Sequence, residues 1–405
     1  MVILESDTRG QDSREVFVVG CGMTKFGRHD DKTLISLMTE SSIRALEDAG
    51  ASERNLDAVY AASMLAGELN NQTAIASALV DQLALTPAAA DRIENGPASG
   101  GSAVKNAYCA IACGMYDTVL VTGGEKMRHV PGERITDYIA TMTNIEAEYI
   151  HGVTLPSLAG MLTRLYMDRY GLTAGDLARV AVKNHLNGSK NPYAHIQQPI
   201  TLEGIYGSPE AAVNNPLIAD PIRMYHCCPV TDGAASVLLS AAEKAKEFTD
   251  TPVRIAGVGQ ATDKMAVQDR KDPAMLEALR AAAAQAFKMS KTTPQDMNLA
   301  ELHDAFTILE IVESEDAGFF KKGTGHFALR DGVTALDGKL PINPSGGLKA
   351  RGHPVGATGV AQIVELTWQL RGEADKRQVK NAQRAFSCNL GGFANNILAF
   401  VLERA

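Results

Sequence analysis

Residues 253–259 read VRIAGVG and residues 16–22 read VFVVGCG, so a short β-branched run ending in Gly-x-Gly occurs twice. Runs of this kind, bounded by glycine, predict buried strands. After the first copy the next glycine, Gly27, falls too late for the G-x-G-x-x-G pattern of a dinucleotide-binding turn. The paired glycines are therefore interpreted as tight backbone turns that follow the strands.

Two more landmarks recur in the same order in the two halves of the chain. A helix opens from small residues at 97–101 and again at 353–359, and a strand runs into a glycine pair at 118–124 and again at 385–392. One such match would mean little, but three in register predict an internal duplication. Strands that alternate with helices also predict parallel βαβ units, and hence an α/β fold with helices covering the sheet.

Residues 125–230 interrupt this plan. The segment contains several methionines and asparagines and scattered prolines, and it is interpreted as an inserted, mostly helical loop domain. Inserts on an α/β scaffold commonly cover a substrate site. The predicted domains are an N-terminal half (14–124 plus 231–249), this insert, and a C-terminal half (250–405).

The composition is typical of an acidic globular protein. The chain has 405 residues, a formal net charge of −8, 45% hydrophobic residues and 21% charged residues. Because it has no basic run, a nucleic-acid surface is disfavoured, since Lys and Arg must neutralise phosphates there. A bound anion remains compatible with this charge, because a local cluster or a helix N-terminus can hold one.

Neither a membrane span nor a disulfide framework is expected. No stretch approaches the roughly 18 apolar residues that a span needs, and residues 1–16 turn polar after four residues, without the apolar core of a signal peptide. Six cysteines are too sparse for a disulfide framework, and no second Cys or His pair stands at metal-ligand spacing. We expect a soluble, cytoplasmic protein with no metal site, whose Cys109 and Cys113 are small buried hydrophobes.

Three segments contain candidate catalytic residues. They are HDAFT at 303–307, NPSGGLKARGHPVGATG at 343–359 and SCNLGG at 387–392. Each places a His or Cys near a strand end or a glycine-rich turn, where backbone N–H groups such as those of Gly391 and Gly392 can converge on an oxyanion. His can give or take a proton near neutral pH. Taken singly, each His is equally compatible with a buried, hydrogen-bonded core residue.

Together these segments resemble the thiolase superfamily, most closely its sterol-carrier-protein-type thiolases and thiolase-like aldolases. The resemblance extends from about residue 16 to residue 402. Further matching motifs are GGEKM at 123–127, KNH at 183–185, NP at 191–192 and DGAA at 232–235. The resemblance implies two duplicated βαβαβαββ halves in a five-layer α-β-α-β-α core, with a loop domain inserted in the first half.

The resemblance also shows which group is missing. The thiolase nucleophile stands in a Cys-Ala-Ser-Gly motif at the start of a buried helix, and this chain has Pro97-Ala98-Ser99-Gly100 there. Proline carries no thiol and no backbone N–H, so it offers neither a nucleophile nor an oxyanion-hole donor. Proline is nevertheless comfortable at a helix start. The extra cysteine of the sterol-carrier-type His-Asp-Cys-Phe motif is Ala305 here.

Other catalytic positions are retained. By resemblance, His353 is the histidine that activates the nucleophile, and His303 holds the thioester oxygen. Cys388 aligns with the family's acid/base cysteine, although Leu390 replaces the glycine of the usual Cys-x-Gly. A small residue at a strand end is the alternative interpretation of Cys388. Ser345, Gly346 and Gly347 are candidates for the lining of a pantetheine channel, with backbone packing as an equal alternative.

Three functional hypotheses follow, all on coenzyme A thioesters as substrate and with no covalently bound cofactor. The first is a thiolase-like acyltransferase of lipid metabolism in which a residue such as Cys388 replaces the nucleophile. The second is a lyase that cleaves a 3-hydroxyacyl-CoA without an acyl-enzyme, because proton transfer next to a thioester needs only a base, an acid and oxyanion donors. The third is a non-catalytic acyl-CoA-binding scaffold. The resemblance further implies a homodimer and a small zinc-ribbon/OB-fold partner that brings its own metal.

Overall fold

The computed structural model describes residues 13–51 and 56–405, and the polar stretch at 1–12 lies outside the described residues. The described strands form one nine-stranded sheet and a small two-stranded one. The N-terminal half contributes, in spatial order, β3 (Ala89–Ile93), β2 (Ala58–Ala62), β4 (Thr118–Glu125), β7 (Gly233–Ala241) and β1 (Val16–Met23). The C-terminal half continues with β8 (Val253–Thr262), β11 (Asn396–Arg404), β10 (Arg384–Gly391) and β9 (Leu299–Glu301).

The strand order confirms the duplication. The halves join where β1 and β8 pair antiparallel over two residue pairs, Phe17 with Arg254 and Val18 with Val253. Outward from this join, the first half runs β1-β7-β4-β2-β3 and the second runs β8-β11-β10-β9. In the second half, the position that corresponds to β3 is occupied by Ile342, which forms an isolated parallel bridge with Ala300 of β9. The two copies therefore have the same topology.

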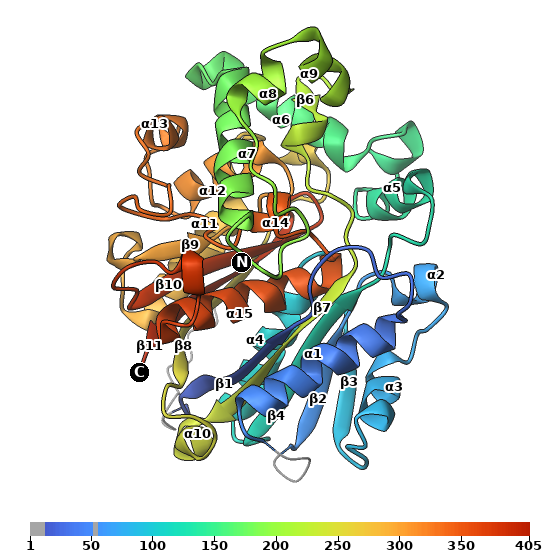
Figure 1. The fold of residues 1–405 in the computed structure, drawn as a ribbon, viewed down its shortest axis with the longest axis vertical. Helices are drawn as coiled ribbons and strands as arrows, with labels where there is room; N and C mark the ends of the chain where they lie inside the picture. The colour runs from blue at the N-terminus through green and yellow to red at the C-terminus, as the bar shows by residue number, and fades with distance from the viewer. Residues whose placement is uncertain (1–12, 52–55) are drawn as a thin grey trace.

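The helices complete five layers. Helices α4 (Ser99–Ala112) and α15 (Thr358–Arg371) lie between the two halves of the sheet, and Figure 1 shows α15 crossing the centre of the molecule. Helices α1 (Leu34–Asp48) and α3 (Ile75–Gln82) cover the outer face of the first half. Helices α11 (Glu277–Ser290) and α12 (Thr307–Asp316) cover that of the second. This is the expected α-β-α-β-α core.

Strand β4 shows how each strand serves two cores. Val119 and Val121 face the central helices, whereas Leu120, between them, faces α1 and α3. All three side chains are fully buried. A strand covered on both faces needs a continuous apolar run rather than an alternation of apolar and polar residues, and VLV at 119–121 is such a run.

The repeated Gly-x-Gly pairs bring a helix close to a strand. Both pairs lie inside strands, so their interpretation as tight turns is wrong. In β8, a Cβ at Gly259 would lie 1.9 Å from the carbonyl oxygen of Ala282 in α11. In β1, a Cβ at Gly22 would lie 2.2 Å from the carbonyl oxygen of Ser41 in α1. Without a side chain at these positions, each outer helix packs directly on the backbone of its strand.

The chain between β4 and β7 forms a mostly helical region, which Figure 1 shows above the sheet. Its helices and the small hairpin are α5 (Gly132–Ala140), α6 (Leu155–Tyr170), α7 (Ala174–Gly188), α8 (Leu202–Tyr206), α9 (Pro209–Asn214), β5 (Leu217–Ala219) and β6 (Ile222–Arg223). Helix α6 begins at a capping box in which Thr154 and Ser157 satisfy each other's backbone N–H groups. The exact domain boundaries stay a prediction.

Shorter helices complete the fold, and they are α2 (Ala66–Asn70), α10 (Ala242–Phe248), α13 (Gly325–Arg330) and α14 (Gly347–Ala350). Among the described residues, no helix combines the length and the apolar character needed to cross a bilayer.

We expect Gly259→Ala to lower the free energy of unfolding by about 1–3 kcal/mol, because the new methyl group would overpack the contact with α11. Gly27→Ala is the matched control, since a Cβ there meets nothing within 4 Å. Urea denaturation followed by circular dichroism measures both variants. Equal midpoints for the two would show that the close strand–helix contact does not constrain the fold.

Candidate active site

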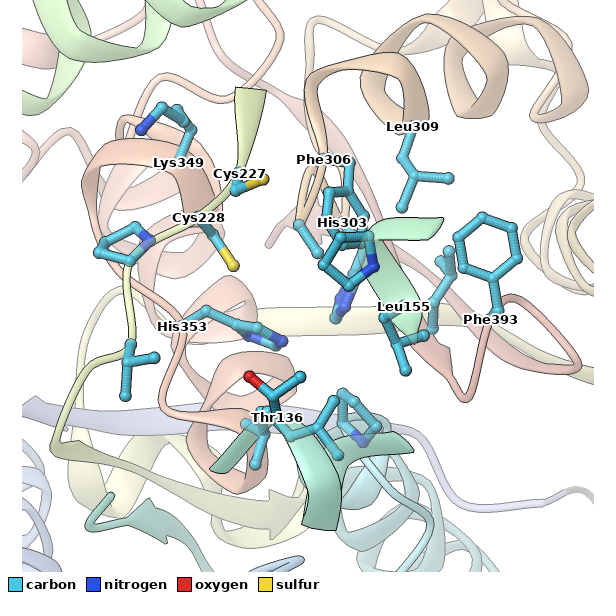
Figure 2. Close-up of a pocket in the computed structure, with 18 of the residues that line it drawn as sticks. Thr136, Leu155, Cys227, Cys228, His303, Phe306, Leu309, Lys349, His353 and Phe393 are labelled. Atoms are coloured by element: carbon cyan, nitrogen blue, oxygen red, sulfur yellow. The ribbon is translucent and has the colours of Figure 1, made fainter. Parts of the chain in front are cut away.

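A cavity of about 560 Å³ lies where the two halves meet the inserted region. Pro97 lines it from the turn before α4, His303 from the turn after β9, and His353 from the turn before α15. Leu390 and Gly392 line it from the end of β10. Most of the remaining lining is apolar and comes largely from the insert, and Figure 2 shows His303 and His353 between these walls. The structure therefore brings both predicted histidines to one cavity.

The hydrogen bonds of His353 fix its tautomer. The Thr358 hydroxyl donates to the carbonyl oxygen of Pro354 at 3.0 Å, so its oxygen accepts from Nδ1–H of His353, 2.7 Å away. Nε2 of His353 therefore carries a lone pair and can act as a base. Burial, and after it the positive charge of Arg351, lowers the pKa of His353 to about 3. The imidazole is thus neutral at pH 7.

His303 has the opposite tautomer because of Asn389. The Asn389 Oδ1 accepts from the backbone N–H of Gly101 at 3.1 Å, which leaves its Nδ2 to donate to the carbonyl oxygen of Pro97 and to Nδ1 of His303, at 3.1 and 3.2 Å. Nε2 of His303 therefore carries the proton. Burial lowers the pKa of His303 well below its ordinary value, and neighbouring His353 and Arg351 lower it further.

The two imidazoles are adjacent, with ring centroids 4.9 Å apart and ring planes at 90°. One offers a hydrogen-bond acceptor and the other a donor, and both are buried, His303 at 3% and His353 at 7% exposed. A base and an oxyanion donor held in an apolar cavity are two of the groups that proton transfer next to a carbonyl requires.

The loop that carries His353 is held by buried carboxylates. Glu301, at the end of β9, accepts from the backbone N–H and the hydroxyl of Ser345 at 3.0 and 2.7 Å. Asp304 accepts from the backbone N–H groups of Leu348 and Lys349. Burial raises the pKa of Asp304 to about 7. These bonds connect the turn after β9 to α14 and so set the position of one histidine relative to the other.

The structure places Cys388 outside the lining of the cavity, and its assignment as a catalytic group stays a prediction. Its side chain is fully buried, and its thiol donates to Oε2 of Glu313 at 3.2 Å. Burial raises the pKa of this thiol well above its ordinary value, and the neighbouring Glu313 raises it further. Leu390, two residues further along β10, lines the cavity instead. Cys388 is thus neither exposed to a substrate nor readily ionised.

The three candidates for a pantetheine channel lie in the loop before α14 and at its first residue, where they shape the backbone. Ser345 is fully buried and donates its hydroxyl to Glu301, and none of Ser345, Gly346 and Gly347 lines the cavity. Their assignment to substrate binding stays a prediction. Gly346 and Gly347 have φ angles of +98° and +58°, and a Cβ on Gly347 would lie 2.4 Å from Asp304. Of the predicted oxyanion glycines, Gly392 lines the cavity and Gly391 lines an adjacent polar pocket.

Sequence reasoning did not anticipate several residues of the site. Cys227, Cys228 and Lys349 all line the cavity, and Asn389 orients His303. Asn389 stands beside Cys388 in the SCNLGG segment, so the sequence indicated its segment but not its contacts. Cys109 and Cys113 are exposed rather than buried, which corrects the expectation for them. Within residues 13–51 and 56–405, no three His, Cys, Asp or Glu side chains are grouped to hold a metal ion.

Comparison with known proteins identifies the family. The model "Thiolase, N-terminal domain" matches residues 16–243, and "Thiolase C-terminal domain-like" matches residues 259–404. The chain belongs to the thiolase family.

Curated relatives cover almost the whole chain. It is 44% identical over 391 residues to an acetyl-CoA acetyltransferase of Methanothermobacter thermautotrophicus, covering 96% of this chain and 100% of that protein. It is 32% identical over 397 residues to human sterol carrier protein 2, covering 93% of this chain and 70% of that protein.

Solved structures share the fold at lower identity. The "Ltp2-ChsH2(DUF35) aldolase" has a TM-score of 0.81 at 22% identity, covering 97% of this chain and 98% of that chain. Human mitochondrial 3-ketoacyl-CoA thiolase has a TM-score of 0.73 at 18% identity, covering 97% of this chain and 99% of that chain.

We expect iodoacetamide to modify Cys109 and Cys113 in the native protein and to leave Cys388 unmodified. The first two are exposed, whereas Cys388 is buried and its thiol is bonded to Glu313. Peptide mass spectrometry after a timed reaction at pH 8 measures each site, and the protein unfolded in guanidinium is the control in which all sites react. Rapid native labelling of Cys388 would contradict the placement.

We expect stability to fall as the pH drops below about 6.5, partly through His353. Its folded pKa is about 3 against an ordinary value of 6.5, so the unfolded chain binds a proton that the folded one excludes. The stabilisation is complete above pH 6.5 and is lost as the pH falls through 6.5 towards 3. His353→Gln should flatten the slope of unfolding free energy against pH by up to about 1.4 kcal/mol per pH unit. Urea titrations at pH 5–7 test this, and an unchanged slope would contradict it.

Proposed function

We propose that this protein makes or breaks the carbon–carbon bond next to the thioester of an acyl-CoA by proton transfer, without an acyl-enzyme. The observation that carries the proposal is the buried pair of neutral imidazoles with opposite tautomers, placed beside a proline where a nucleophile would stand. Relatives named acetyl-CoA acetyltransferase support a CoA thioester as the substrate. The apolar wall of the cavity suits an acyl chain.

A retro-aldol step on a 3-hydroxyacyl-CoA uses both imidazoles. Nε2 of His353 takes the proton of the 3-hydroxyl group, and the bond between C2 and C3 breaks to release an aldehyde or ketone. The bonding pair forms the enolate of the shortened thioester, whose oxygen accepts from Nε2–H of His303. His353 then returns its proton to C2. Protons and electrons balance within one turnover, and the reverse sequence forms the bond.

Covalent acyl transfer is less well supported by the cysteines near the site. Burial raises the pKa of Cys227 to about 11 and that of Cys228 to about 12, so neither is a thiolate at pH 7. In the described structure the thiol of Cys227 donates to the carbonyl oxygen of Arg223 rather than to an imidazole. Proton transfer needs no thiolate, and it is the chemistry that the available groups favour.

A homodimer, a small zinc-ribbon/OB-fold partner and a cytoplasmic location remain part of the proposal. One solved neighbour, the Ltp2-ChsH2(DUF35) aldolase, joins two components in its name, which supports a second subunit by analogy. Ile218, Met224 and Val230 line the cavity yet are 49%, 44% and 37% exposed. Such an apolar rim suits a docked protein or the acyl-CoA itself.

The test is a screen of 3-hydroxyacyl-CoA and 3-oxoacyl-CoA thioesters, with release of aldehyde or ketone scored separately from acetyl transfer to CoA. We expect carbonyl release from a 3-hydroxyacyl-CoA, at least 100-fold less in His353→Ala because general base catalysis contributes about 10²–10⁴-fold. The control is Lys244→Met, which replaces a lysine on α10 whose side chain is 43% exposed.

Intact-mass spectrometry after incubation with short acyl-CoAs completes the test. We expect no acyl adduct on the wild type. A stable adduct on any cysteine would overturn the proposal in favour of acyl transfer, and binding without turnover in either screen would favour the scaffold. Pro97→Cys restores a thiol at the start of α4, and an acetyl adduct confined to that variant would support the role assigned to Pro97.

A further inference from the structure

Lys349 is a buried lysine in the wall of the cavity, and burial lowers the pKa of its amine. It lies on α14, is 4% exposed and lines the cavity together with Cys227 and Tyr225. Figure 2 shows its side chain running away from His303 and His353, so its ammonium is not aimed at the site of proton transfer. Its Nζ lies 5.8 Å from the ring centroid of Tyr225.

The other poorly exposed lysines show what Lys349 lacks. The side chains of Lys126 and Lys183, each 9% exposed, pair with Asp232 and Glu310. Across residues 13–51 and 56–405, no carboxylate lies within ion-pair distance of Lys349. The nearby carboxylate of Asp304 is occupied by backbone N–H groups and by Asn184. A buried ammonium without a counter-charge is costly, so a group that binds there and brings a negative charge is favoured.

His185 supplies a second polar atom without a partner in the wall of the cavity. His185 is 2% exposed, and its Nδ1 lies 3.0 Å from the carbonyl oxygen of Gln198, to which it donates. Its Nε2 has no hydrogen-bond partner within the described chain, and the ring lines the cavity. The ring packs edge-on to Tyr225, with centroids 6.1 Å apart. Lys349, Tyr225 and His185 thus form a polar corner in an otherwise apolar cavity.

We infer that Lys349 and His185 form a subsite for a carboxylate at the far end of the acyl chain, so that the preferred substrates are CoA thioesters of dicarboxylic acids. This inference rests on the proposed function, because it concerns the acyl group of the same CoA thioester. One carboxylate oxygen accepts from the ammonium of Lys349. The other accepts from Nε2 of His185 once that nitrogen takes a proton from solvent, which the bound anion favours against the burial and the charge of Lys349 that lower the pKa of His185 to about 4. The anion thereby supplies the counter-charge that the described chain does not provide.

The experiment measures dissociation constants for matched pairs of unreactive thioesters by isothermal titration calorimetry. Succinyl-, glutaryl- and adipyl-CoA are compared with butyryl-, valeryl- and hexanoyl-CoA, so that each pair differs by one terminal carboxylate. We expect at least one dicarboxylic thioester to bind the wild type roughly tenfold more tightly than its partner, as a charge-assisted hydrogen bond allows. Lys349→Met should abolish or reverse that preference, and His185→Phe should reduce it.

The controls separate this inference from its alternatives. Lys244→Met removes an exposed lysine on α10 and should leave the preference unchanged. Equal affinity of the wild type for both members of every pair would overturn the inference. An equal loss for both members in Lys349→Met would overturn it too, because it would place Lys349 on the CoA moiety. If no thioester binds at all, the proposed function itself fails.

Discussion

The contact between α4 and α15 is the constraint on which the rest of the site depends. A Cβ at Gly359 would lie 2.2 Å from the backbone nitrogen of Gly101 and 2.3 Å from Oδ1 of Asn389. The two helices therefore meet backbone to backbone where the duplicated halves face each other. Only at that separation can the carboxamide of Asn389 bond to α4 and to His303 at once. The packing of the core thus sets the protonation pattern of the site.

This arrangement explains why the fold accepts a proline where a nucleophile is expected. Pro97 stands one residue before the N-cap of α4, Ala98, where a backbone N–H has no helical partner to lose. The carbonyl oxygen of Pro97 still accepts from Asn389. A proline at this position offers neither a thiol nor an N–H donor to the cavity, and the bonds that orient His303 are present beside it. A proline at this position is therefore compatible with an ordered pair of imidazoles.

The sequence predicted the fold better than it predicted the site, for a physical reason. Repeated glycine landmarks follow from backbone packing, which leaves a periodic trace in the chain, and the histidines stand in motifs at element ends. Whether a residue near the end of a strand reaches the cavity leaves no such trace in the sequence. Cys388 and Leu390 belong to the same core cluster, yet only Leu390 reaches the cavity. Lys349 follows a glycine-rich turn, and only the packing of α14 shows that its side chain is buried.

The proximity of the imidazoles also bears on how a proton moves through the site. When His353 takes a proton, its new charge lies beside His303 and near the guanidinium of Arg351, and the charge of Arg351 opposes it. Burial adds to that opposition, because the cavity offers the imidazolium little solvation. In the proposed retro-aldol step the protonated state is therefore short-lived, and the enolate carbon is the group to which His353 returns its proton. A base held in such surroundings returns its proton in the same turnover, which suits reversible carbon–carbon chemistry better than the storage of charge.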